Sequence, residues 1–174
     1  MPEDPLAPVS EPLGEEGTID AARYRQVLGH FATGVTVVTT TSGGEPAGLA
    51  VNSFTSVSLS PPLIAFCVAR TSATWARIQA AGAFCVNVLA EDQEDVCRVF
   101  AAKGGDKFSG IGYHPSATGS PRLNDVLAWV DCEIDAVHDA GDHEVCIGRV
   151  KELEVERREG PLLFFRGGYG RFEQ

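Results

Sequence analysis

The chain has 174 residues, of which 44% are hydrophobic and 22% are charged, and its formal net charge is −10. The length suits one globular domain with its own core, and the acidic balance argues against a surface that binds nucleic acid or an anionic membrane. No stretch is long and apolar enough to cross a bilayer, and the first residues lack the basic start and apolar run of a signal peptide, so we expect a cytoplasmic protein.

The chain contains five cysteines, at positions 67, 85, 97, 132 and 146. An odd number with no CxxC pair disfavours both a disulfide framework and a zinc knuckle. We therefore expect five reduced cysteines that pack in the interior, as free cysteine commonly does.

Proline, glutamate and glycine dominate residues 1–17, which predicts a mobile acidic tail followed by one domain at residues 18–174. The domain opens with an amphipathic segment that predicts a helix. Thr18 or Asp20 can cap its start, and Gly34 suits its end. Four apolar residues stand at the i, i+3, i+4 and i+7 positions of one helix face: Tyr24, Val27, Leu28 and Phe31.

From Val35 onward the pattern changes to β-branched and alternating runs, which predict strands. We expect strands at 35–41, 47–54, 61–69, 83–89, 128–138, 144–156 and 161–172. The alternation in 83–89 predicts that this strand is buried on one face. About seven mostly consecutive strands, with helices only as inserts, favour an antiparallel barrel or sandwich over a doubly wound parallel sheet.

Two further helices interrupt these strands. One is expected near 72–82, with Trp75 and Ile78 directed inward. The other is expected near 91–105. Its apolar face would hold three residues: Val96, Val99 and Phe100.

The run GDHEVCIGRV, which starts at Gly141, places His143 and Cys146 next to acidic residues. His143 and Cys146 are an odd number of positions apart on a predicted strand, so they face opposite sides and cannot share a metal without a bulge. No metal site is expected. The same geometry argues against a nucleophilic Cys146 with His143 as its base. Two roles remain open for His143: a structural histidine, or one that contacts a ligand at the mouth of a strand.

Small hydroxyl and amide side chains gather near predicted strand ends in three segments, 31–40, 50–62 and 69–75. Hydroxyls and free backbone N–H groups at a helix start bind anions, and Arg70 adds a bidentate donor for phosphate. The alternative for each segment is an ordinary turn or edge strand rich in serine and threonine. The sequence has no Walker lysine motif and no GxGxxG after a strand, which disfavours an NTPase and a Rossmann dinucleotide fold.

Six segments occur in one order: FATGVTVVTT, GLAVNSFTSVSLSPPLIAFCV, FCVNVLAEDQEDVCRVFA, DKFSG, AWVDCEIDAVHDAGDHEVCIGRV and LLFFRGGYGRF. Together they closely resemble the flavin reductase-like FMN-binding split-barrel family. More narrowly, they resemble the NAD(P)H:flavin oxidoreductases that serve two-component flavin monooxygenases. The resemblance covers about residues 20–174.

The resemblance implies a mainly β protein with short helices: a Greek-key-like antiparallel split barrel of about six or seven strands, dimeric, with flavin near the interface of the homodimer. It implies hydride transfer from NADH or NADPH to FMN or FAD, after which the reduced flavin diffuses to a flavin-dependent monooxygenase partner. No basic pocket for a 2′-phosphate is evident, which favours NADH. Two alternatives remain: a flavin-binding electron carrier or sensor that does not oxidise NAD(P)H, and a barrel adapted to another substrate.

The resemblance also implies site residues. Against the flavin ring would lie one run: Thr33, Gly34, Val35, Thr36, Val37 and Val38. The ring and the ribityl chain would be held by a second run: Asn52, Ser53, Phe54 and Thr55. Towards the ribityl and phosphate groups would lie Ser58, Ser60 and Ser72, with Lys107 as a charge partner. His143 would seat the nicotinamide by a hydrogen bond or by stacking, as the candidate catalytic side chain, and Tyr169 would pack nearby.

Overall fold

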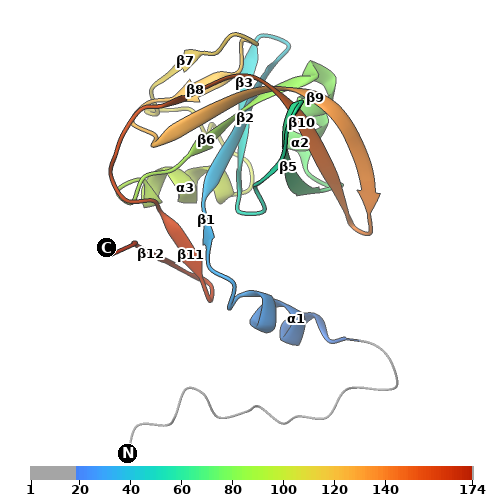
Figure 1. Ribbon diagram of the computed structural model, residues 1–174, viewed down its shortest axis with the longest axis vertical. Helices are drawn as coiled ribbons and strands as arrows, with labels where there is room; N and C mark the ends of the chain where they lie inside the picture. Colours follow the sequence, from blue (N-terminus) through green and yellow to red (C-terminus); the bar gives the residue numbers. More distant parts are fainter. Residues whose placement is uncertain (1–18, 174) are drawn as a thin grey trace, which may run out of the picture.

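The computed structural model describes residues 19–173, and Figure 1 shows them as a β-barrel with one helix set apart from it. The predicted tail at 1–17 and the alternative cap Thr18 lie outside these residues. The described helices are α1 Ala21–Leu28, α2 Ala73–Ala81 and α3 Glu94–Ala101. The longest of them has nine residues, too few for a helix to cross a bilayer. The strands are β1 Thr33–Gly34, β2 Thr36–Ser42, β3 Glu45–Val51, β4 Thr55–Leu59, β5 Pro62–Ala69, β6 Ala83–Val88, β7 Tyr113–Pro115, β8 Pro121–Leu123, β9 Ala128–Ala140, β10 His143–Val155, β11 Leu163–Phe165 and β12 Gly168–Gly170.

One seven-stranded antiparallel sheet carries the fold, in the order β3-β2-β6-β9-β10-β5-β4. β3 and β4 follow one another in the chain but lie at opposite edges of this sheet. The chain from Val51 to Thr55 can span at most about 14 Å, so the sheet curls until its two edges approach each other (Figure 1). In the described chain these edges are not hydrogen-bonded to each other. The barrel is therefore split, and the predicted mainly β, antiparallel split barrel with short helices is confirmed.

β6 runs through the middle of the sheet, between β2 and β9. Phe84 and Val86 belong to one apolar core cluster, whereas Cys85 and Leu89 belong to a second cluster on the other face. Residues 84–87 have no exposed surface. The prediction of a strand buried on one face was wrong, because a central strand that is covered on both sides buries all of its side chains.

α2 and α3 lie on this sheet and bury short apolar faces. Trp75 and Ile78 of α2 are buried, as predicted. In α3 the buried residues are Cys97 and Phe100, one turn apart. Val99, which was predicted to share a face with Val96 and Phe100, is 40% exposed, because it stands about 200° around the helix axis from the buried Cys97.

α1 begins at the cap Asp20, whose carboxylate accepts a hydrogen bond from Arg23 N–H at 3.1 Å. It ends at Leu28, so the predicted end at Gly34 was wrong: Thr33–Gly34 forms β1, which pairs with β11. The described chain leaves the apolar face of this segment uncovered. The exposed fractions are 56% for Tyr24, 59% for Val27, 52% for Leu28 and 76% for Phe31.

All five cysteines are free thiols. Four are buried, as expected, and Cys67 on β5 is exposed. The prediction of interior packing was wrong for Cys67, because neighbouring strand residues point to opposite faces. Phe66 and Val68 take the core face of β5, which directs Cys67 to the outer face.

Candidate functional site

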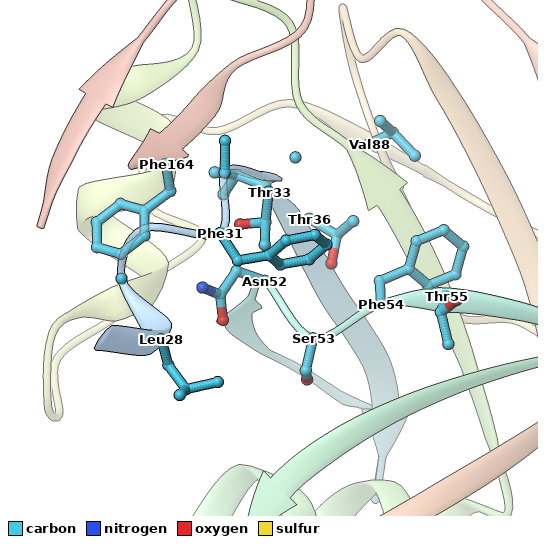
Figure 2. A pocket seen from close by; sticks show the side chains of 14 residues that line it. Leu28, Phe31, Thr33, Thr36, Asn52, Ser53, Phe54, Thr55, Val88 and Phe164 are labelled. Atoms are coloured by element: carbon cyan, nitrogen blue, oxygen red, sulfur yellow. The ribbon is translucent and has the colours of Figure 1, made fainter. Parts of the chain in front are cut away.

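A cavity of about 690 Å³ opens at the split of the barrel, beside the segment that joins β3 to β4 (Figure 2). Its walls come from the chain between α1 and β2, from the 52–55 segment, and from single residues of β6 and β11. The lining residues are Leu28, Gly29, Phe31, Ala32, Thr33, Gly34, Val35, Thr36, Asn52, Ser53, Phe54, Thr55, Val88 and Phe164. None of them carries a charge, so the cavity is suited to an uncharged, mainly apolar ligand group.

Eight residues that the resemblance singled out meet in this cavity: 33–36 on one wall and 52–55 on the other. Pairing of β1 with β11, in which Thr33 lies opposite Phe164, holds the first wall in place. A Cβ added at Gly34 would meet nothing within 4 Å. A side chain there would project into open space, so the glycine leaves room beside the backbone.

The hydroxyl of Thr33 is buried and has no hydrogen-bond partner among the described residues. A buried hydroxyl without a partner costs free energy. Thr36, on the same wall, differs because its Oγ1 donates to the carbonyl of Val51 at 2.7 Å. Of these two threonines, Thr33 therefore has the hydroxyl that a ligand in the cavity can use.

Ser53 ties the second wall to β5. Its Oγ accepts a hydrogen bond from Cys67 N–H at 2.9 Å and donates to Cys67 C=O at 3.1 Å. β4 pairs with β5 as far as Thr55 and Ala65, so the Ser53 side chain continues this pairing by one more step. The Ser53 side chain thus holds the 52–55 wall against β5 at a point where the backbone no longer pairs with that strand.

Several residues from the resemblance do not line this cavity. Val37 and Val38 are fully buried in the two core clusters, behind the wall. Ser58 lies on β4, and Ser60 precedes the cis peptide bond to Pro61. The structure does not bring these four side chains to the cavity.

Ser72 and Lys107 also lie outside the lining and have partners within the fold. The Ser72 side chain caps α2 and accepts a hydrogen bond from Trp75 N–H at 3.2 Å. Lys107 Nζ donates to the carbonyls of Gly48 at 3.3 Å and Phe100 at 2.9 Å. Burial lowers the pKa of the Lys107 ammonium from its usual value.

Tyr169 lies next to the cavity. Its ring centroid is 5.4 Å from that of Phe164, and it lines a neighbouring cavity of about 180 Å³ together with Asn52. The phenol oxygen is 3.3 Å from Cys97 Sγ. This contact, together with burial, raises the pKa of Tyr169 to about 12. Tyr169 therefore packs nearby as an un-ionised side chain.

His143 is the first residue of β10 and lies opposite Ala69 of β5. Its Nδ1 is 2.7 Å from Asp142 Oδ1, and this hydrogen bond lowers the pKa of the Asp142 carboxyl. Because Asp142 is then ionised at neutral pH and can only accept, the proton lies on Nδ1 and Nε2 is left free. Cys146 is fully buried, which agrees with the prediction that it faces away from His143.

His143 and the cavity are connected through β5. Cys67 and Ala69 point to the same face of this strand, and their partners on β10 are Val145 and His143. Ser53, on the cavity wall, holds the backbone of Cys67. His143 therefore stands on the outer face of the sheet that continues from the second wall, although it does not line the cavity itself.

Sequence reasoning missed part of the lining. Phe31 was assigned to a helix face, and Phe164 to a closing strand, with no role for either in a site. Leu28 reaches the cavity from the end of α1, and Val88 from the end of β6. Helical spacing marked Leu28 and Phe31 only as part of a helix face, and no local pattern marks any of the four as cavity lining, since their contacts join segments far apart in the chain.

The chain matches the family model described as "Flavin reductase like domain" over residues 28–173. It is 52% identical over 155 residues to a flavin reductase of Pseudomonas putida, covering 88% of this chain and 91% of that protein. It is also 52% identical over 151 residues to the reductase subunit HsaB of a flavin-dependent monooxygenase of Rhodococcus jostii, covering 87% of this chain and 77% of that protein.

Solved structures share the fold. Nitrilotriacetate monooxygenase component B from Mycobacterium thermoresistibile has a TM-score of 0.85 and 47% identity, covering 87% of this chain and 86% of that one. A Streptomyces globisporus NADH:FAD oxidoreductase in complex with NAD and FAD fragments has a TM-score of 0.84 and 37% identity, covering 88% of this chain and 93% of that one.

Proposed function

Because the chain belongs to the flavin reductase-like domain family, we propose that this oxidoreductase uses NAD(P)H to reduce free FMN or FAD by hydride transfer. The reduced flavin would then diffuse to a flavin-dependent monooxygenase partner. Relatives at 52% identity are named flavin reductase and reductase subunit of a flavin-dependent monooxygenase. We also take 18–174 as the functional domain and 1–17 as its tail.

One observation carries the flavin assignment: eight expected residues meet in an uncharged cavity of about 690 Å³, where the buried Thr33 hydroxyl has no partner in the described chain. A cavity of this size accepts a planar ring system. Apolar side chains such as Phe31 and Phe164 would cover the ring. Thr33 would supply a hydrogen bond at its edge.

A bound flavin would supply the hydride-accepting chemistry, with the chain providing position and electrostatics. Backbone N–H groups of 52–55 would lie where the reduced ring develops negative charge. The Ser53 bonds to Cys67 would keep these groups in place. Val35 and Val88 would keep water away from the ring.

His143 would seat the nicotinamide. Its Nε2 is free to bond a ligand, because Asp142 holds the proton on Nδ1. No proton transfer by His143 is needed for the hydride step. NADH is the preferred donor in this proposal, since the sequence shows no evident basic pocket for a 2′-phosphate. Ser58, Ser60, Ser72 and Lys107 stay proposed contacts of the ribityl and phosphate groups.

A homodimer and a cytoplasmic location complete the proposal. The uncovered apolar face of α1 supports a second copy as its partner, because Phe31 at 76% exposure and Val27 at 59% exposure would otherwise face water. The same face adjoins the cavity through Leu28. Light scattering at several protein concentrations tests the dimer directly.

The function is tested by mixing the purified full chain with excess FMN or FAD under anaerobic conditions, adding NADH or NADPH, and following the visible absorbance of the flavin. Catalytic bleaching of excess flavin is the expected result. Flavin that binds without being reduced would support the electron carrier or sensor instead. Absence of flavin binding would overturn the assignment of the cavity.

A further inference from the structure

The β9–β10 hairpin carries His143 at its tip (Figure 1), and β5 accompanies β10 up to that residue. β6 pairs with β9 only as far as Glu133. From residue 135 onward, β10 is the only strand neighbour of β9 in the described sheet. On its other side β10 pairs with β5 from Arg149 to His143, so the outer half of the hairpin has a strand neighbour along its β10 edge and none along its β9 edge in the described sheet. The turn at 141–142 lies beyond the last strand pairs, so the place of the His143 ring depends on what holds this turn.

Arg70 supplies backbone contacts to this tip. It follows Ala69, the last residue of β5 and the partner of His143. The Arg70 N–H donates to the carbonyl of Asp142 at 3.2 Å, which extends the pairing into the turn. Its Nε donates to the carbonyl of Gly141 at 2.9 Å. Both residues of the turn are therefore held through their main chain.

The guanidinium also reaches the strands on both sides of the turn. Its Nη2 donates to Asp139 Oδ1 at 2.7 Å, and Nη1 lies 3.6 Å from Glu144 Oε1. The other oxygen of Glu144 accepts a hydrogen bond from Trp75 Nε1–H. Trp75 is 1% exposed and belongs to a core cluster. These contacts join the tip of the hairpin to the core of the barrel.

The main-chain bond to Asp142 needs no particular side chain, but only an arginine side chain can reach Gly141, Asp139 and Glu144 together. Its guanidinium has five N–H donors in a rigid fork, whereas a lysine ammonium is a point charge on a flexible stem. The exposed ion pair with Asp139 contributes little by itself. The value of Arg70 lies in joining several groups of the tip at once. These contacts also occupy the fork that the sequence suggested for phosphate.

We propose that Arg70 is a positioning residue of the flavin reductase reaction: it fixes the β9–β10 turn so that His143 meets the nicotinamide in one orientation. This inference rests on the proposed role of His143. Arg70 acts through His143 and does not touch the cavity, since it is not among the lining residues. Its loss should therefore affect nicotinamide binding and leave flavin binding unchanged.

The test is a double-mutant cycle in the full chain, with Arg70→Met, His143→Ala and the double variant. Steady-state KM for NADH and kcat are measured at saturating flavin. Amide hydrogen exchange over residues 139–144 is measured without nicotinamide. We expect Arg70→Met to raise KM for NADH about fivefold, the scale of one lost hydrogen bond, with kcat nearly unchanged and faster exchange at the tip. In the His143→Ala background, Arg70→Met should add nothing to KM.

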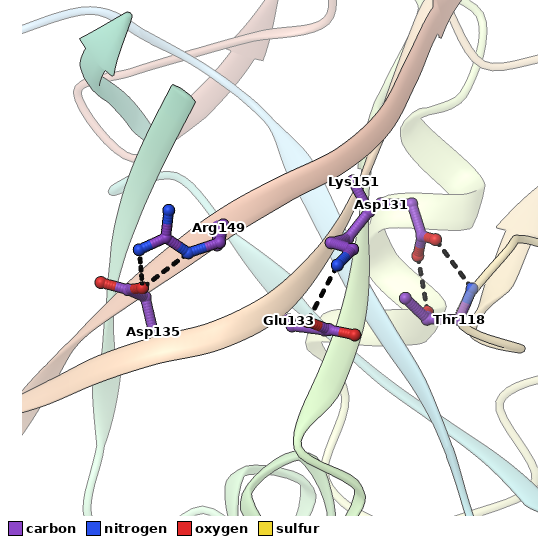
Figure 3. Close-up of polar contacts among 6 residues, drawn as sticks. All are labelled: Thr118, Asp131, Glu133, Asp135, Arg149 and Lys151. Carbon is purple, nitrogen blue, oxygen red and sulfur yellow. Dashed lines mark hydrogen bonds and ion pairs between the residues drawn. The ribbon is translucent and has the colours of Figure 1, made fainter. Parts of the chain in front are cut away.

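Arg149→Met is the matched control, because Arg149 lies on the same hairpin and its Nε and Nη2 donate to Asp135 Oδ1 at 2.9 and 2.5 Å (Figure 3). Its side chain is 44% exposed, against 40% for Arg70. The control should leave KM for NADH and exchange at 139–144 unchanged. Arg70→Lys, which keeps the charge but not the fork, should behave like Arg70→Met.

Two failures are distinguishable. If His143→Ala leaves KM for NADH unchanged, the nicotinamide seat itself is wrong, and Arg70 has nothing to position. If His143→Ala raises KM but Arg70→Met does not, or if the two effects multiply, the seat stands and Arg70 does not act through it. Unchanged exchange at 139–144 in Arg70→Met would equally overturn the positioning role, whatever the activity.

Discussion

Ser53 holds Cys67 by both of its backbone groups: the serine Oγ accepts from the N–H at 2.9 Å and donates to the C=O at 3.1 Å. The pair joins the cavity wall at 52–55 to β5, where the two edges of the sheet come together without pairing. The Ser53 hydroxyl thus makes the two hydrogen bonds to the Cys67 backbone that a neighbouring strand would otherwise make. Removal of this hydroxyl should therefore lower the stability of the fold and weaken ligand binding in the cavity.

Ser53→Ala should lower the free energy of unfolding by about 1–2 kcal/mol, the scale of two exposed hydrogen bonds. It should also weaken flavin binding by about 1 kcal/mol or more, because the wall is no longer fixed. Urea unfolding and equilibrium dialysis with FMN measure the two effects. Ser56→Ala, on the exposed face of β4 and outside the lining, is the control. Unchanged dialysis for Ser53→Ala would remove this wall from the site.

Thr33→Val should separate ligand binding from folding. Valine keeps the shape and removes a buried hydroxyl that has no partner in the described chain. The flavin-free protein should gain about 1 kcal/mol of stability, while flavin affinity falls about fivefold. Thr36→Val should instead lower the stability of the flavin-free protein, since it removes the hydrogen bond from Oγ1 to Val51 C=O. Equal effects of both variants on flavin affinity would contradict the distinction between the two threonines.

Ser72→Asp tests whether the α2 cap also contacts a phosphate. Aspartate caps helices as well as serine does, so the free energy of unfolding should stay within about 0.5 kcal/mol of the original. Its carboxylate would repel a phosphate, and FMN affinity should then fall while that of uncharged riboflavin is kept. Ser72→Ala should cost about 1 kcal/mol of stability. Equal losses for FMN and riboflavin in Ser72→Asp would exclude a phosphate at this position.

Stability should fall in alkaline solution. Burial raises the pKa of the thiols of Cys85, Cys132 and Cys146, that of Cys146 to about 12. The unfolded chain releases these protons first, near the ordinary value of 9.0. These three thiols therefore leave the free energy of unfolding unchanged below about pH 9 and lower it above that pH, with a limiting slope of about 1.4 kcal/mol per pH unit for each thiol.

Urea unfolding under reducing conditions between about pH 7 and pH 11 measures this slope. Cys146→Ala should reduce it by about 1.4 kcal/mol per pH unit, because one thiol no longer contributes. Cys67→Ala is the control, since this thiol is exposed in the folded protein. The proposal of ionisation on unfolding fails if both variants keep the full slope.

Local periodicity was sufficient for the elements whose side chains alternate between core and solvent. Trp75 and Ile78 of α2 are buried as their spacing predicts. β4 was not predicted, because its serines indicate a turn or a run of donors as readily as a strand. It pairs on one side only, with β5, and its Val57 is 50% exposed. An edge strand of this kind forms because it pairs with the adjacent strand. The local sequence does not show which segment that adjacent strand will be.

The part of the cavity lining that could be predicted is the part formed by continuous runs of sequence. Residues 33–36 and 52–55 reach the cavity because the turn at the split brings the two runs together. Ser72 and Arg70 were singled out correctly as polar residues near a helix start, but their structural roles depend on α2 and on the β9–β10 turn. Hydroxyl-rich composition does not say whether a hydroxyl serves a ligand or the fold.

The contact between Trp75 and Glu144 has a practical consequence. The chain has two tryptophans, and the indole N–H of Trp129 donates to Glu156 at 2.8 Å, whereas that of Trp75 donates to the hairpin that carries His143. In a Trp129→Phe background, the tryptophan fluorescence of the protein, excited beyond the absorption of tyrosine, would come from Trp75 alone. The barrel thus contains its own optical reporter of the hairpin, and nicotinamide binding could be followed through indole emission without any attached dye.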